Sequence, residues 1–261
     1  MNFYASANIM DDRTVSQIAP SGAFFITSEI SCANPFMSAQ QFKLICSDQG
    51  LTVDDMTPSY LGRRNLEGGG RQQDIRHNSY RYVLGVEGEL SNGWAYDVSY
   101  SNSETAVAST YMNDLSITRI KRALDVILDA DGNPACRSAV NGTDPNCVPW
   151  NVFINNGNQI VDDPVDGVTQ AALDYLIVDL YARGEVYEEI WQAVLSGQID
   201  ALNGANVVVG IEQRTTGMDN RPDIGFLTGD GAGQGGPTKA LGGEYDVCLL
   251  YTSDAADDSA C

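Results

Sequence analysis

Two pairs of cysteines offer the clearest chemistry in this chain, and the reaction that their spacing suggests is oxidation to disulfides. Cys32 and Cys46 flank one polar segment, while Cys136 and Cys147 flank another that is rich in Asn, Gly, Pro and Asp. None of these spacings is the C-x2-C of a zinc site, and His77 is the only histidine of the chain. We therefore expect two local disulfides and an oxidising compartment, with four buried free thiols as the alternative.

Arginines give the second candidate site. Arg63, Arg64 and Arg71 form the one concentrated basic spot, and Gly68–Gly70 lies between them. In an acidic chain such a cluster would suit an anionic ligand or a lipopolysaccharide phosphate, because guanidinium groups bind phosphate with two parallel hydrogen bonds. The same groups would equally pair with neighbouring carboxylates. We favour this structural pairing and keep ligand binding as the weaker hypothesis.

Three further motifs fail in their sequence context. Gly231–Gly236 matches G-x-G-x-x-G, but it does not follow a strand and open a helix, so we expect a surface loop. Asp129–Asn133 resembles the start of a calcium loop without its later glutamate, which predicts a turn and leaves adventitious calcium binding open. Glu188 and Glu189 resemble an acid/base pair only by adjacency. We expect no catalytic site, no metal site and no cofactor.

Segments that alternate between apolar and polar residues must position these groups. Alternation with a period of two predicts β-strands that expose one face of each kind. A tight turn at Ser91–Gly93 joins two of these segments, and a turn near 201–205 joins two others. The expected strands are 1–10, 80–90, 94–101, 190–199, 207–212 and 244–250.

The connections between these strands alternate in length. The expected long polar loops are 11–56, 109–185 and 218–242. Following the chain up and down places every short turn on one side and every long loop on the other. This arrangement is typical of an outer-membrane barrel, whereas a β-sandwich distributes its loops over both ends. Within the middle loop, 169–176 predicts a short helix with Thr169 as its N-cap, and Leu173, Leu176 and Leu180 on one face.

Aromatic residues agree with a membrane-spanning wall. Tyr82 and Trp94 are expected near strand ends on the apolar face, where an interfacial girdle would place them. The alternative is that they are ordinary core aromatics of a β-sandwich.

Charge and hydropathy exclude two classes of protein. The 261 residues contain 15 Lys+Arg against 35 Asp+Glu, for a formal net charge of −20. A nucleic-acid partner is not expected, because phosphate neutralisation needs basic patches. A membrane protein of helical type is not expected either, because no stretch approaches the roughly 18 apolar residues of a spanning helix.

Several segments, in their order along the chain, resemble the barrel of TonB-dependent outer-membrane receptors of the proteobacterial type. The similarity covers roughly residues 1–247. The segments that carry it are Asn34–Phe36, Gly62–Arg71, Tyr80–Leu90, Trp94–Tyr100, Ala123–Val126, Cys136–Ser138, Cys147–Pro149, Ala172–Leu176 and Val209–Glu212.

The resemblance implies a 22-stranded barrel in the bacterial outer membrane, filled by an N-terminal plug. Such receptors take up a scarce nutrient, such as an iron–siderophore, vitamin B12 or a carbohydrate, with energy relayed by TonB. The implied partners are the plug, the TonB complex, outer-membrane lipid and a small nutrient ligand. The plug has no counterpart in this segment, which would be an internal piece of about six strands, so Met1 need not be the true start.

Within this reading each strand face receives a role. The polar faces would line the lumen, and their residues are Arg81, Glu87, Asp97, Ser99, Gln192 and Glu212. The apolar faces would meet lipid, and their residues are Leu84, Val86, Trp94, Val98, Leu195, Val209 and Ile211.

The end of the sequence departs from the family pattern. Val247–Asp258 resembles the translated read-through of a common sequencing adapter. We therefore expect a partial barrel domain over 1–247 and a non-native tail over 248–261, with a natural acidic tail as the alternative.

Two other functions remain open at this point. A secreted acidic β-sandwich that binds a ligand, with calcium in its loops, would share the alternation. A secreted hydrolase is the weakest hypothesis, because it would need two convergent carboxylates.

Overall fold

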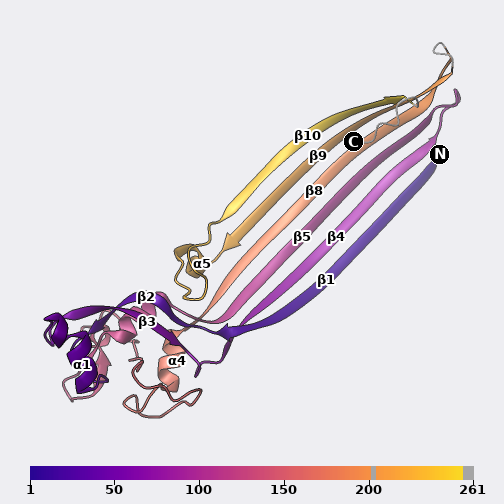
Figure 1. The fold of residues 1–261 in the computed structure, drawn as a ribbon. Helices are drawn as coiled ribbons and strands as arrows, with labels where there is room; N and C mark the ends of the chain where they lie inside the picture. The colour runs from indigo at the N-terminus through magenta and orange to yellow at the C-terminus, as the bar shows by residue number, and fades with distance from the viewer. Residues whose placement is uncertain (201–203, 255–261) are drawn as a thin grey trace.

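The computed structural model describes residues 1–200 and 204–254, and it is built around one antiparallel sheet (Figure 1). Six long strands lie side by side in the order β1-β4-β5-β8-β9-β10, and in the described residues the sheet is open at β1 and β10. Their bounds are β1 (Asn2–Pro20), β4 (Gly70–Glu89), β5 (Ala95–Leu115), β8 (Ile177–Ile199), β9 (Ala205–Pro222) and β10 (Leu241–Asp254). The all-β, antiparallel class predicted from the alternation is therefore confirmed.

All six expected strands are present, but they are much longer than the sequence indicates. The β4–β5 ladder runs from Gln72 opposite Met112 to Glu89 opposite Ala95. Alternation marks only the stretch where one face is apolar, and the backbone ladder continues where both faces are polar. The expected loop bounds were therefore wrong, and the long connections are 21–69, 116–176 and 223–240.

These three connections form the part of the molecule that we call the cap, beyond one end of the sheet (Figure 1). The cap contains two small hairpins and several short helices. The hairpins are β2 (Gly22–Ser31) with β3 (Met56–Arg64), and β6 (Val126–Leu128) with β7 (Pro134–Cys136). The helices are α1 (Ala39–Ile45), η1 (Ser47–Gln49), α2 (Ile117–Leu124), α3 (Arg137–Val140), α4 (Gln170–Leu176) and α5 (Ile224–Thr228). Among the described residues, every helix is too short to cross a membrane.

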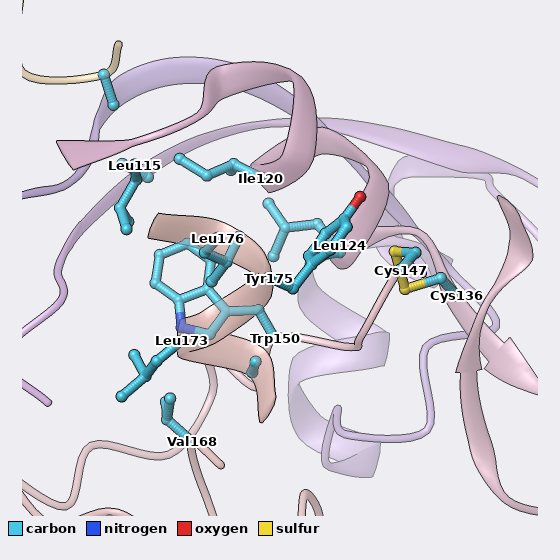
Figure 2. Packing of buried hydrophobic residues seen from close by; sticks show 14 of the residues in the cluster. Leu115, Ile120, Leu124, Cys136, Cys147, Trp150, Val168, Leu173, Tyr175 and Leu176 are labelled. Atoms are coloured by element: carbon cyan, nitrogen blue, oxygen red, sulfur yellow. A yellow bond between two sulfur atoms is a disulfide. The ribbon is translucent and has the colours of Figure 1, made fainter. Parts of the chain in front are cut away.

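Most buried apolar side chains lie in the cap, and Tyr111, Leu115 and Leu180 add to them from sheet strands near the cap. Trp150 is fully buried, and Figure 2 shows Leu173 and Leu176 of α4 beside it, with Ile120 and Leu124 of α2 close by. Amphipathic helices of this length are stabilised mainly by such packing, because isolated short helices are marginal in water.

The predicted helix in the middle connection is confirmed. The Thr169 side chain accepts a hydrogen bond from the backbone N–H of Ala172 and so caps α4. Ile177 leaves the helical conformation, and β8 begins there. Leu180 is therefore a strand residue, and the expected shared helix face with Leu173 was wrong.

Both predicted disulfides are present in the cap. Cys32 follows β2 and is joined to Cys46, the C-terminal cap of α1. Cys136 ends β7 and is joined to Cys147 within the buried cluster of Figure 2. The two bridges thus fasten short loops to the small hairpins.

The segment that the sequence assigns to a non-native tail is partly structured. β10 continues through Asp254, and Cys248 lies opposite Gln213 of β9. Residues 255–261 lie outside the described residues.

Candidate functional site

Strand register sorts the side chains of the sheet into two faces, because directly opposed residues of paired strands point to the same side. Val86 is opposite Val98, Val98 is opposite Ala193, and Ala193 is opposite Ile211. We call the side of this row the apolar face. Ser99 is opposite Gln192, and Gln192 is opposite Glu212. We call the side of this second row the polar face.

All seven residues expected on the apolar side lie on the apolar face. Leu84 and Val86 of β4 share it with Val98 of β5, and Leu195 of β8 is opposite Val209 of β9. Ile211 belongs to the defining row. Trp94 precedes β5 on the same side, where a Cβ atom at Gly197 would stand 2.4 Å from its ring. Glycine at this position lets the indole cover the neighbouring strand.

All six residues expected on the polar side lie together on the polar face. Glu87 is opposite Asp97, and Arg81 is opposite Ser103. Ser99, Gln192 and Glu212 form the defining row of this face. The register therefore gathers each of the two predicted sets on its own side of the sheet.

Aromatic rings mark the border of the apolar face on the cap side. The ring centroids of Tyr82 and Tyr100 are 6.2 Å apart, and those of Tyr100 and Trp191 are 4.4 Å apart. Tyr80 stacks on Tyr82 with a centroid distance of 6.2 Å and donates its hydroxyl to Glu104 at 2.8 Å. We call these four rings the aromatic row. Its members have apolar bodies and polar tips, as residues at a boundary between lipid and water do.

The sequence predicted Tyr82 near a strand end, and this was wrong, because β4 extends from Gly70 to Glu89. It sits instead where the apolar stretch of the strand ends. Trp94 lies at the opposite limit, next to the Ser91–Gly93 turn, as expected.

Large apolar side chains are exposed between these two borders. Leu84 is 54% exposed, Ile211 is 50% exposed and Val98 is 41% exposed. Soluble monomers rarely leave a contiguous apolar surface of this kind uncovered.

Charged and hydroxyl groups compensate one another on the polar face. Glu212 is only 6% exposed and accepts from Arg214 Nε at 3.1 Å, while Arg214 Nη2 lies 2.8 Å away. The Tyr251 hydroxyl donates to the other Glu212 oxygen at 3.3 Å, and Tyr4 donates to Asp97 at 2.9 Å. These partners offset the cost of removing the Glu212 carboxylate from water. Sequence reasoning missed Arg214 and Tyr251. Arg214 could have been found, because it is two positions from Glu212 on β9 and therefore lies on the same face.

The three arginines of the basic spot are engaged inside the molecule. Arg63 forms a salt bridge of 2.7 Å with Glu67 and lies 5.4 Å from the centre of the Trp150 ring. Arg64 donates to the Pro20 carbonyl at 2.9 Å.

Arg71 completes this set of structural contacts. It donates to the Ala19 carbonyl at 2.9 Å and to the Tyr111 hydroxyl at 2.9 Å. These contacts favour the structural role of the basic spot over an anion site, because each of the three guanidinium groups already donates to oxygen atoms within the molecule.

The glycine-rich segment of the cap packs against residues of β4 and β5. Gly233 donates its N–H to Asp114, and a Cβ atom at Gly233 would stand 1.9 Å from Arg71 Nη1. Glycine is needed here for close approach, not for phosphate binding. Asp114 is completely buried and was missed by sequence reasoning, because only the fold brings it to residue 233.

Asp129–Asn133 forms the tight turn between β6 and β7, as predicted. The Asp129 side chain accepts from the backbone N–H groups of Asp131 and Asn133 at 2.9 and 2.8 Å. This is the local hydrogen bonding by which aspartate favours turns.

Three polar side chains join α2, α4 and the loop after α3. Tyr175 donates its hydroxyl to Asp144 at 2.7 Å, and Arg122 donates to the same oxygen at 2.7 Å. Burial, with the neighbouring carboxylate, raises the pKa of Tyr175 to about 12. The hydrogen bonds from Tyr175 and Arg122 lower the pKa of Asp144.

Comparison of the chain with protein-family models, curated proteins and solved structures finds no match.

Proposed function

We propose that this chain forms part of the wall of an outer-membrane receptor that takes up a scarce nutrient with energy relayed by TonB. The observation that supports the proposal best is the separation of the two predicted sets of residues onto opposite sheet faces by a single register. The apolar face would meet lipid, and the polar face would line the lumen.

The size of the apolar face agrees with a bilayer. From Tyr80 to Leu90 a strand rises about 34 Å. At the tilt of about 40° usual for barrel strands, this corresponds to roughly 26 Å across the membrane, close to the apolar band of about 25 Å in such barrels. The aromatic row and Trp94 would then lie at the two interfaces.

The open edges of the sheet fit the same proposal. β1 and β10 present unpaired backbone groups, which are costly in lipid and favour pairing with further strands. The cap would lie outside the cell, where two disulfides are stable, and would meet the nutrient. The siderophore, vitamin B12 or carbohydrate class of the nutrient, the plug and the TonB complex come from the family resemblance alone.

The three tryptophans provide a direct test. Trp94 and Trp191 lie on the apolar face, whereas Trp150 is buried in the cap. We would refold single-tryptophan variants into vesicles with brominated acyl chains, which quench only nearby indoles. We expect strong quenching of Trp94 and Trp191 and little quenching of Trp150. Equal quenching of all three, or a monomeric chain that melts cooperatively in plain buffer, would overturn the proposal and favour a secreted ligand-binding module.

A further inference from the structure

Four arginines stand in one line across the sheet. Arg13 of β1 is opposite Arg76 of β4, and Arg183 of β8 is opposite Arg221 of β9. Between the two pairs, Ala108 of β5 is opposite both Arg76 and Arg183. We call these four side chains the arginine row. They are far apart in the sequence, so only the register reveals them.

The arginine row is on the apolar face, just beyond the aromatic row. Arg76 is four positions before Tyr80 on β4, so the two side chains lie on the same face of the sheet. Asn78, between them, lies on this face as well, and so does Ala106, which is opposite it. Four residues of strand correspond to about 13 Å. If the aromatic row marks the membrane interface, this distance places the arginine row at the level of the lipid headgroups.

Two directly opposed pairs of like charges are costly to the sheet. The neighbouring carboxylates relieve only part of this repulsion. Asp74 lies 2.7 Å from Arg13 and 4.0 Å from Arg76, and Asp219 pairs with Arg221. Arg183 forms no salt bridge with any residue in the described parts of the chain.

A hollow opens beside Arg183. Its volume is about 370 Å³, and its lining includes Arg183 and Arg221 with Ala106 and Ala108. Glu185 and Asp219 also line it, so the site is not uniformly basic. The two alanines leave room for a group to reach the guanidinium ends from the side of the membrane.

We propose that the arginine row, centred on Arg183, binds the phosphate of a lipid headgroup whose acyl chains lie on the apolar face. The inference rests on the proposed function, since it requires that this face meets lipid. Guanidinium groups bind phosphate in a bidentate way, and the adjoining apolar surface suits acyl chains. A bound phosphate would also relieve the repulsion between Arg183 and Arg221.

The test compares two lipids that differ only in the phosphate. The refolded 261-residue chain in neutral detergent would be titrated with phosphatidic acid or with the matching diacylglycerol, and bound lipid counted by native mass spectrometry. We expect retention of phosphatidic acid only. R183Q should weaken it about fivefold, and R76Q/R183Q by about a further fivefold, as expected for one interfacial charge each. R183K should lose less affinity than R183Q but remain weaker than the wild type, because lysine keeps the charge without the bidentate geometry.

R81Q is the matched control, because Arg81 is on the polar face of the same sheet. It should leave retention of phosphatidic acid unchanged. Equal affinity in wild type and R183Q, or an equal loss in R81Q, would overturn the inference. If Trp94 and Trp191 are still quenched by brominated lipid in that case, the proposed function stands. If neither is quenched in the wild type, both proposals fail together.

Discussion

Gly233 donates its backbone N–H to the buried carboxylate of Asp114, at 3.0 Å from Oδ1 and 3.1 Å from Oδ2. The same carboxylate accepts from the Ser21 hydroxyl and from the N–H of Leu115 at 2.9 Å. Asp114 therefore ties together the end of β5 and two separate cap connections. A buried carboxylate that accepts from several donors is expensive to remove, because each donor loses its partner.

The first prediction concerns this carboxylate. D114A should destabilise the cap by about 2–4 kcal/mol, because the donors from Ser21 and Gly233 are left buried and unpaired. Urea unfolding followed by Trp150 fluorescence, in a W94F/W191F background, measures the change. D131A, in the exposed turn after β6, is the control and should alter stability little. Equal effects of the two substitutions would show that Asp114 is not a central acceptor.

The second prediction concerns the disulfides. C136S/C147S should destabilise the cap by about 3 kcal/mol, because the bridge restricts the unfolded chain over a sequence separation of 11. C32S/C46S should lower the stability of the buried cluster by less, since neither Cys32 nor Cys46 belongs to that cluster. Urea midpoints with and without reductant compare the pairs. Unchanged midpoints in both variants would mean that packing alone holds the cap.

The third prediction concerns alkaline pH. Tyr175 has a pKa raised to about 12, so its contribution to folding is fully present below the ordinary tyrosine pKa of about 10. The contribution is then lost as the pH rises through about 12. The unfolding free energy of the cap should fall over this window. Y175F should show a shallower fall, and an identical pH profile in both proteins would contradict the assignment.

The fourth prediction tests the two faces with one adjacent pair of residues. Val98 is on the apolar face, and Ser99 is on the polar face. V98R should weaken folding into vesicles by roughly 2–4 kcal/mol, as for arginine near a bilayer midplane, and S99R by much less. Urea titration of vesicle-bound protein measures both. A larger cost for S99R would mean that the faces are reversed.

Sequence reasoning succeeded where a local pattern controls the structure. Alternation around Leu84 and Val98 located the sheet, because one face there is apolar. Cys136 and Cys147 were recognised as a pair because they flank one short polar loop, and Thr169 because helix capping is local.

The remainder depends on contacts between distant residues. The polar halves of the strands carry no alternation, so nothing in the sequence near Arg13 or Arg183 marks a strand. The arginine row requires the register of five strands. The contact between Asp114 and Gly233 joins residues separated by 119 positions, and no local pattern reports it.

The location of the buried cluster in the cap has a thermodynamic consequence. The heat-capacity increment of unfolding scales with the apolar surface that becomes hydrated. Side chains such as Trp150 and Leu176 would contribute to it, whereas Leu84 and Ile211 are half exposed already. In a calorimetric scan in detergent, the heat-capacity increment of unfolding should therefore be that of a protein the size of the cap, and smaller than expected for a chain of 261 residues.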